Sequence, residues 1–218
     1  MEIYSKLSRF FPNQFRQPTG WLGQVVGWLE SRRNEAANDF VLANLRVEAG
    51  DVVLETGFGP GVTVQKLAKQ VGHGKVLGVD FSREMAAQAR KRNGQGLREG
   101  RVFLAIGDMC AVPLPSNTCN KILGISVFYF LEDPHACLIE LRRVLQPGGR
   151  IGFYLTSKED LLKEKFTQVG NFRLYTGEEV VTMLEAAGFV GARYTTTKIN
   201  QRTGMCVLAE KRGKGEER

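Results

Sequence analysis

Two spacings of apolar residues alternate along this chain, and they predict strands and helices in turn. Short apolar runs rich in β-branched residues are typical of strands, and they occupy residues 52–56, 75–80, 102–108, 121–128 and 150–156. Apolar residues three and four positions apart are typical of helices, and this spacing recurs within residues 21–45, 64–71, 82–93 and 137–145.

Strands that alternate with helices in this way form βαβ units, in which the strands lie parallel and the crossovers are right-handed. The predicted strands are apolar at nearly every position, as expected when helices cover both faces of a sheet. Ser82 is expected to cap one helix, Gly72 to end another, and the sequence QPGG to close the helix at 137–145.

The C-terminal part of the chain has a different pattern. Thr176 and Glu179 form a predicted capping box, which starts a helix that Gly188 ends. Two β-rich runs follow at residues 191–199 and 204–211, and the short link between them requires antiparallel pairing. We therefore predict an α/β fold whose mostly parallel sheet finishes in an antiparallel hairpin.

The composition suits one globular domain, because 43% of the 218 residues are hydrophobic. The formal net charge is +7, but the basic residues are scattered. That distribution favours solvated faces over a working basic patch, an alternative that stays open. The longest apolar run, residues 122–131, is too short to cross a membrane. We expect a cytoplasmic chain, monomeric or homodimeric, with no membrane span.

The cysteines carry little signal in the sequence. Four of them are widely spaced and none forms a CxxC pair, at Cys110, Cys119, Cys137 and Cys206. We expect free, partly buried thiols in a reducing cytoplasm, and no metal site. Their spacing gives no indication that they converge near a pocket.

A glycine loop directly follows the first predicted strand, at Gly57, Gly59 and Gly61. Ligands bind at the carboxyl ends of the strands in open α/β sheets, whereas a tight turn, the alternative interpretation, usually needs one glycine. The dinucleotide fingerprint places a glycine where this chain has Val62. Asp80 closes the second strand, where its two carboxylate oxygens can accept hydrogen bonds from ribose hydroxyls.

Four motifs together resemble those of the class I S-adenosylmethionine-dependent methyltransferases. They are VLETGFGPG, GVDFS, AIGDMCAVPLPSNTCNKIL and ELRRVLQPGGRI, and they stand in the order and spacing of that family. The likeness is greatest to the small-molecule branch that includes ubiquinone-type and other natural-product enzymes. It implies a Rossmann-like, doubly wound α/β/α sandwich with seven strands, the last one antiparallel.

The resemblance also implies which residues bind the cofactor, S-adenosylmethionine, and its product S-adenosylhomocysteine. They are Glu55, Thr56, Gly57, Phe58, Gly59, Gly61, Asp80, Phe81, Met85, Asp108, Met109, Ile125 and Ser126. In the family pattern, Glu55 helps to hold the methionine ammonium and Asp80 takes the ribose hydroxyls. Ile125 and Ser126 line the floor near the sulfonium.

The adenine contacts implied by the resemblance come from the ends of the second and third strands. Phe81 and Met85 flank the ring, although ordinary packing between helix and sheet would also explain both side chains. Asp108 accepts a hydrogen bond from the amino group, and the Met109 amide reaches a ring nitrogen.

Methyl transfer from a sulfonium needs alignment more than acid–base help, so a strong catalytic base is not required. The catalytic residue is therefore unknown from the sequence. His135 and Tyr129 are candidates, and Tyr154 is a further polar group near the predicted pocket. A capping or surface role for His135 is the favoured alternative.

The predicted division of the chain is a helical lid or cap segment at 1–45, a methyltransferase domain at 46–211 and a flexible tail at 212–218. Aromatic residues are dense before the first helix, where they form a lid or fix the segment to the surface. A lid of this kind suits a small, hydrophobic or aromatic acceptor.

Three other functions are weighed against this one. A catalytically silent binding or assembly protein would have no need of an intact Gly57, Asp80 and Asp108. An RNA-directed methyltransferase is disfavoured, because the chain reads GISVFYFLEDP where enzymes that methylate base amines carry Asn/Asp-Pro-Pro-aromatic. A nicotinamide dehydrogenase is disfavoured by Val62 and by the terminal hairpin.

Overall fold

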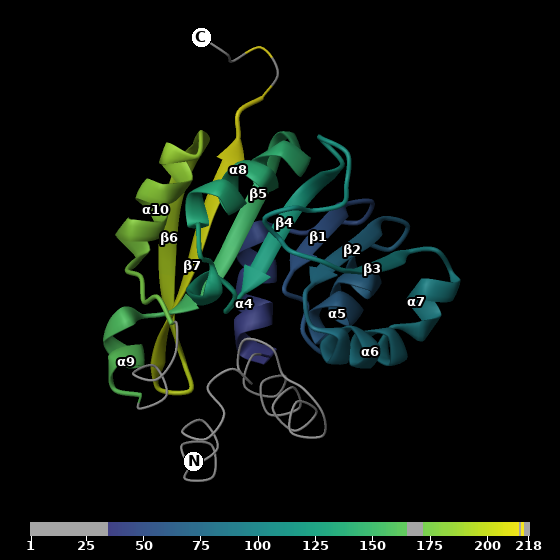
Figure 1. The fold of residues 1–218 in the computed structure, drawn as a ribbon, viewed down its shortest axis with the longest axis horizontal. Helices are drawn as coiled ribbons and strands as arrows, with labels where there is room; N and C mark the ends of the chain where they lie inside the picture. The colour runs from purple at the N-terminus through teal and green to yellow at the C-terminus, as the bar shows by residue number, and fades with distance from the viewer. Residues whose placement is uncertain (1–34, 165–171, 214, 216–218) are drawn as a thin grey trace.

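The computed structural model describes residues 35–164, 172–213 and 215, and these contain a seven-stranded sheet (Figure 1). The strands are β1 (Val52–Thr56), β2 (Lys75–Asp80), β3 (Val102–Ile106), β4 (Cys119–Ile125), β5 (Leu145–Thr156), β6 (Phe189–Ile199) and β7 (Arg202–Lys211). Their order is β3-β2-β1-β4-β5-β7-β6, and β7 runs antiparallel to both β5 and β6, whereas the other neighbouring strands pair in parallel. The predicted doubly wound sheet with an antiparallel C-terminal hairpin is confirmed.

Helices cover both faces of the sheet. They are α4 (Glu35–Leu45), α5 (Val62–Gln70), α6 (Arg83–Arg92), α7 (Gly94–Arg98), α8 (Pro134–Val144), α9 (Lys158–Leu162) and α10 (Gly177–Ala186), with a 3-10 turn at Phe128–Phe130. Helices α8 and α10 contribute to one core cluster, and α4, α5 and α6 to the other (Figure 1). Among the described residues, none of these helices has the length and apolar character needed to cross a bilayer.

Burial on both faces explains why the strands are apolar at nearly every position. In β1, Leu54 enters the core under α8 and α10, and its neighbour Val53 enters the opposite core. Successive side chains of a strand point to opposite faces, so a strand covered on both sides needs apolar residues throughout.

The first described helix belongs to the core of the domain. In α4, Val41 and Leu45 are fully buried, and both face Gly152 of β5, where an added Cβ would lie 3.4 Å from Leu45 Cδ1. The structure thus packs residues 35–45, assigned above to the N-terminal segment, against the sheet. Residues 1–34, where the lid was predicted, lie outside the described residues.

The N-terminal caps of two helices, α6 and α10, form as the sequence predicts. The Ser82 hydroxyl accepts a hydrogen bond from the Met85 amide at 3.3 Å, at the start of α6. The capping box of α10 is complete, because the Thr176 hydroxyl accepts from the Glu179 amide and the Glu179 carboxylate from the Thr176 amide. Each cap satisfies amides that the first helical turn leaves unpaired.

The helix predicted at 137–145 ends just before QPGG, and these four residues form an irregular start of the fifth strand. Helix α8 ends at Val144 and β5 begins at once at Leu145. Leu145 already pairs with Cys119, and residues 146–149 bulge out before pairing resumes at Arg150. The glycines therefore serve an irregular strand start, with Gly148 at a φ of +76°. The short helices α7 and α9 were not predicted.

Candidate functional site

A cavity of about 480 Å³ opens at the carboxyl ends of the central strands. It begins over the loop after β1, at Gly57, and passes the ends of β2 and β3 at Asp80 and Asp108. It continues to the start of α8, at Asp133 and Ala136. This is the crevice where open α/β sheets bind ligands.

The three glycines of the loop have different reasons to be glycine. All adopt left-handed backbone angles, with φ between +51° and +75°. An added Cβ would lie 2.3 Å from Val127 Cγ1 at Gly57 and 2.7 Å from Ala89 Cβ at Gly61, so packing excludes side chains at both. At Gly59 an added Cβ would meet no described residue within 4 Å. As far as the structure describes the chain, the backbone at Gly59 is therefore open to a ligand.

The Asp80 carboxylate holds the glycine loop in place. Its Oδ2 accepts a hydrogen bond from the Gly59 amide, and its Oδ1 one from the Ser82 amide, each at 2.8 Å. Burial raises the pKa of Asp80, and these two amide hydrogen bonds partly offset that rise by favouring the charged form. Each oxygen keeps lone pairs for a further donor, and the residue lines the cavity.

Glu55, at the end of β1, is a buried acid with an unsatisfied atom. Its side chain is 3% exposed, and Oε2 has no hydrogen-bond partner among the described residues. Burial raises its pKa well above the usual range, a hydrogen bond with the Thr63 side chain opposes this, and the nearby charge of Asp80 adds to it. A buried, unpaired carboxyl oxygen is suited to a cationic ligand group.

The ends of β2 and β3 supply a further wall. Phe81, which is 41% exposed, lines the cavity together with Asp108 and Met109. The Asp108 carboxylate accepts a hydrogen bond from the Cys110 amide at 2.9 Å, which orients it. An exposed aromatic ring beside a carboxylate can contact a planar ligand ring that carries polar substituents.

Several residues that the resemblance implied do not line this cavity. They are Glu55, Thr56, Phe58, Gly61, Met85, Ile125 and Ser126, and Gly59 also lies outside the lining. Phe58 and Met85 are 3% and 4% exposed, and Phe58 packs over Gly78. The Thr56 hydroxyl donates to the Leu123 carbonyl at 3.1 Å. Met85 is buried in the first turn of α6.

The candidate catalytic residues also lie outside the lining. The Tyr129 hydroxyl accepts a hydrogen bond from the Thr156 amide at 2.5 Å, and burial raises its pKa well above the usual value. Tyr154 is likewise buried, with its pKa raised by burial. His135 is exposed in the first turn of α8, between two residues that line the cavity, Asp133 and Ala136.

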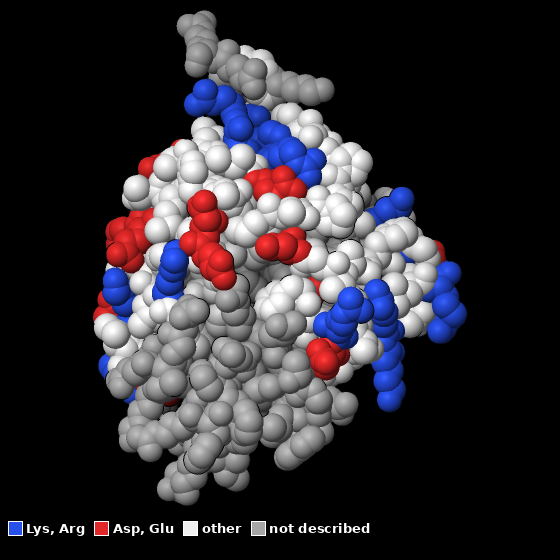
Figure 2. Space-filling view, in the orientation of Figure 1, with Lys and Arg blue, Asp and Glu red and all other residues white. Residues whose placement is uncertain are grey.

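Sequence reasoning missed one part of the cavity wall. It consists of Val127, Phe130, Leu131, Glu132 and Asp133, which follow β4. Their place after a strand at the carboxyl edge of the sheet was the available signal. Figure 2 shows Asp and Glu side chains around the middle of the molecular face that is turned toward the viewer, whereas Lys and Arg lie toward the periphery of that face.

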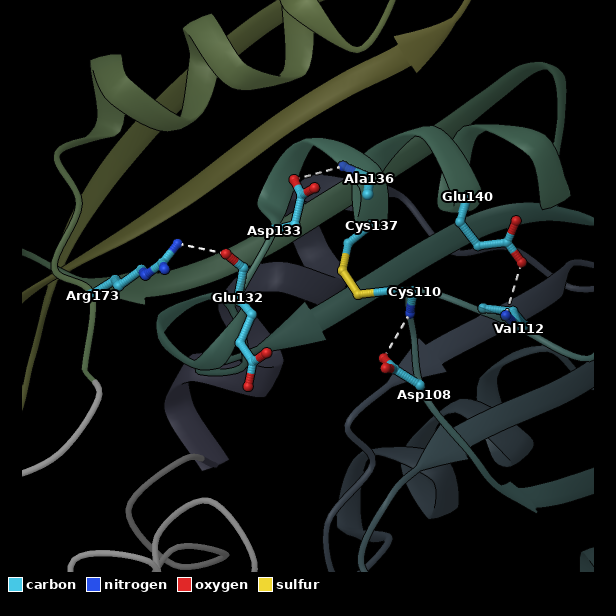
Figure 3. Close-up of a disulfide and its surroundings, with 9 residues drawn as sticks. All are labelled: Asp108, Cys110, Val112, Glu132, Asp133, Ala136, Cys137, Glu140 and Arg173. Carbon is cyan, nitrogen blue, oxygen red and sulfur yellow. Dashed lines mark hydrogen bonds between the residues drawn. A yellow bond between two sulfur atoms is a disulfide. The ribbon is translucent and has the colours of Figure 1, made fainter.

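The expectation of four free thiols is wrong for one pair. Cys110, which lines the cavity, is joined by a disulfide to Cys137 of α8 (Figure 3). The two residues are 27 positions apart and come from different elements, so their spacing gave no indication of the contact. Cys119 and Cys206 are free and buried, as expected.

This chain is similar to several proteins named as methyltransferases. A family model described as a methyltransferase domain matches residues 53–149. An uncharacterized methyltransferase of Bacillus subtilis, YdaC, is 25% identical over 86% of this chain and 98% of its own length. A demethylmenaquinone methyltransferase of Lactobacillus johnsonii is 29% identical over 78% of this chain and 70% of its own.

Solved structures give the same likeness. The crystal structure of a SAM-dependent methyltransferase from Aquifex aeolicus superposes with a TM-score of 0.65 and 28% identity, over 79% of this chain and 88% of that one. Some curated relatives are longer proteins, and this chain spans 32% and 50% of the length of two of them.

Proposed function

We propose that this chain, which belongs to the class I S-adenosylmethionine-dependent methyltransferases, transfers a methyl group to a small acceptor with a hydrophobic or aromatic body. The observation that carries the proposal is the extent of the cavity. It runs beyond the residues suited to the donor, past Phe130 and Leu131, toward α8. That extension leaves room for a second ligand beside the donor.

Two features of the structure fit S-adenosylmethionine. The unpaired Oε2 of Glu55 suits the ammonium of an amino acid, and the open backbone at Gly59 lets a ligand lie against it. Asp80 would accept the ribose hydroxyls, and Phe81, Asp108 and Met109 would contact the adenine. When bound, the cofactor supplies a methyl group already activated by the positive sulfur.

The part of the cavity wall that follows β4 supports a hydrophobic acceptor. Val127, Phe130 and Leu131 are apolar, and the Phe130 ring packs against Phe172 with centroids 5.0 Å apart. The charged residues in the described lining are carboxylates, which disfavour an anionic acceptor such as RNA. The relative named for demethylmenaquinone is consistent with an acceptor that has a hydrophobic body.

The chain's own contribution to the reaction is placement and exclusion of water. Gly57 and Val127 bring the loop after β1 and the wall after β4 into contact, so the two ligand positions share one boundary. Alignment of this kind can lower a barrier by several kcal/mol without acid–base catalysis. The Tyr129 hydroxyl is committed to the Thr156 backbone, which leaves His135 as the candidate for any proton transfer.

The test combines donor binding with a screen of acceptors. Isothermal titration with S-adenosylhomocysteine comes first, and then quinols, phenols, small amines and total RNA are incubated with S-adenosylmethionine and assayed for methyl incorporation. Turnover of a phenol or quinol supports the proposal. Donor binding without turnover of any acceptor indicates the silent binding protein, and methylation confined to RNA would contradict the small-molecule assignment.

A further inference from the structure

The disulfide between Cys110 and Cys137 crosses the wall of the cavity. Cys110 follows Asp108 and Met109, which line the cavity from the β3 side. Cys137 lies one residue after Ala136, which lines it from the α8 side. Figure 3 shows the sulfur bridge between these two elements, with Asp108 on one side and Glu132 on the other. The bond therefore joins two adjoining parts of the wall, one after β3 and one at the start of α8.

The disulfide also affects the position of the Asp108 carboxylate, a group that would contact the donor. The Cys110 amide donates to the Asp108 carboxylate at 2.9 Å, so the position of Cys110 sets the orientation of that carboxylate. Asp108 is exposed, and Met109, which lies between Asp108 and Cys110, is half-buried. A restraint at Cys110 is thus transmitted directly to the segment 108–110.

A second set of contacts holds the same two elements together without the sulfurs. The Val112 amide donates to Glu140 Oε1 at 2.8 Å. The Arg143 guanidinium donates to the carbonyl of Leu114 at 2.9 Å and pairs with Glu140. These contacts anchor residues 112–114 on α8, so the two thiols stay near each other after reduction. A pair held in this way can exchange between the thiol and disulfide forms.

The other two cysteines cannot compete for this bond. Cys119 and Cys206 are buried, and burial raises the pKa of each thiol to about 12. The thiolate is the form that attacks a disulfide, so both residues are inert in exchange. In a reducing compartment, where we expect this chain to work, a disulfide that persists in part is usually redox-sensing or catalytic.

We propose that Cys110 and Cys137 form a reversible disulfide that controls binding of the donor. The inference rests on the proposed function, because it takes the cavity as the donor site. In the oxidised form the segment 108–110 is fixed against α8 and ready for the ligand. In the reduced form that segment gains freedom, and binding must then restrict it at a cost in affinity.

The chemistry is ordinary thiol–disulfide exchange. One thiolate of the pair attacks a small disulfide such as glutathione disulfide and releases one glutathione thiolate. The second thiolate of the pair then attacks the resulting mixed disulfide and displaces the other glutathione thiolate. The Cys110–Cys137 sulfur bond forms, the glutathione sulfur bond breaks, and two glutathione thiols take the protons and the electron pair. A dithiol reductant reverses the reaction.

The test needs no substitution in its first arm. The full chain is titrated calorimetrically with S-adenosylhomocysteine after incubation in dithiothreitol, and again after oxidation with glutathione disulfide and removal of excess reagent. Peptide mass mapping identifies the linked cysteines. We expect a Cys110–Cys137 link, and an affinity at least threefold higher in the oxidised form.

Two variants sharpen the result. Cys137→Ser should bind S-adenosylhomocysteine as the reduced wild type does, under both conditions. Cys119→Ser keeps the pair and preserves a donor to the Val144 carbonyl, so it should respond to oxidation as the wild type does. Equal, measurable affinity in both redox states, or a different pairing, overturns the switch alone. Absence of binding in both states overturns the donor site as well.

Discussion

Asp80 Oδ2 accepts a hydrogen bond from the Gly59 amide at 2.8 Å, so the acid that ends β2 fixes the loop that follows β1. The same carboxylate lines the cavity. One side chain thus shapes the backbone on which the donor would lie and offers its remaining lone pairs to that donor. The two strands are paired in register, Val79 with Thr56, which keeps the acid and the loop together.

Replacing Asp80 should therefore remove two contributions at once. Asp80→Ala is expected to weaken binding of S-adenosylhomocysteine by more than about tenfold, because hydrogen bonds to a charged acceptor are worth more than neutral ones. Asp80→Asn, which can still accept from one amide, should bind with intermediate affinity. Calorimetry at one pH measures all three proteins, and an unchanged affinity in Asp80→Ala would remove this residue from the site.

Gly59 offers a matched pair of substitutions. Gly59→Ala and Gly100→Ala both force a side chain into a left-handed backbone, at φ values of +51° and +65°, and in the part of the chain that the structure describes neither Cβ meets an atom within 4 Å. Each should lose about 1–2 kcal/mol of folding free energy.

The two alanine variants should differ in binding. Gly100 precedes β3 at the amino ends of the parallel strands, whereas the cavity lies at their carboxyl ends. Urea unfolding and calorimetry report stability and affinity separately. Gly59→Ala should lose donor binding, whereas Gly100→Ala should keep it. Equal affinity in both variants would mean that no ligand lies against Gly59.

The stability of the ligand-free protein should depend on the protonation of Glu55. Burial raises the folded-state pKa above the ordinary value of 4.5, so the folded state binds this proton more tightly than the unfolded state. The contribution of Glu55 to stability therefore decreases as pH rises from about 4.5 through the raised folded value. Thermal unfolding across that window should show the decrease in the wild type and a smaller one in Glu55→Gln.

Donor binding should have the opposite dependence on pH. A ligand ammonium beside Glu55 favours the ionised carboxyl, so binding releases a proton and affinity increases with pH through the same window. Calorimetry in buffers of different ionisation enthalpy counts the released protons. A wild type that releases no more protons than Glu55→Gln would contradict a role for this acid in holding the ammonium.

The N-terminal segment should matter for the acceptor and not for the donor. Deleting residues 1–18 leaves α4 and every described residue of the cavity lining in place, so S-adenosylhomocysteine should bind as before. Turnover of the acceptor found in the screen should be abolished. A truncated protein that methylates at the original rate would show that no lid is formed by this segment.

Much of the fold could be predicted from the sequence, because local and global requirements agree there. Strands β1 and β2 occupy the predicted residues, since buried parallel strands need continuous apolar runs. The insertion of β7 between β5 and β6 could not be predicted, because antiparallel pairing of the hairpin fits either strand order. The one-turn helix α9 is too short to show a periodic pattern.

The site was harder to predict than the fold. Gly57, Asp80 and Asp108 stand at strand ends, so topology alone brings them to one edge. The wall after β4 and the contact of Cys110 with Cys137 depend on how a connecting segment crosses to α8. No spacing in the sequence encodes that crossing, because its anchors are side-chain hydrogen bonds to backbone groups far along the chain.

The strand order has a consequence for the time course of synthesis. The described residues that line the cavity lie within residues 57–136, and so they leave the ribosome before the hairpin of β6 and β7 is made. Strand β6 is synthesised before β7. Among the described strands it is hydrogen-bonded only to β7, so its backbone stays unpaired until β7 is made. The parallel strands can thus assemble around the ligand cavity first, and a donor captured by the nascent chain would act as a template for the half of the sheet still to come.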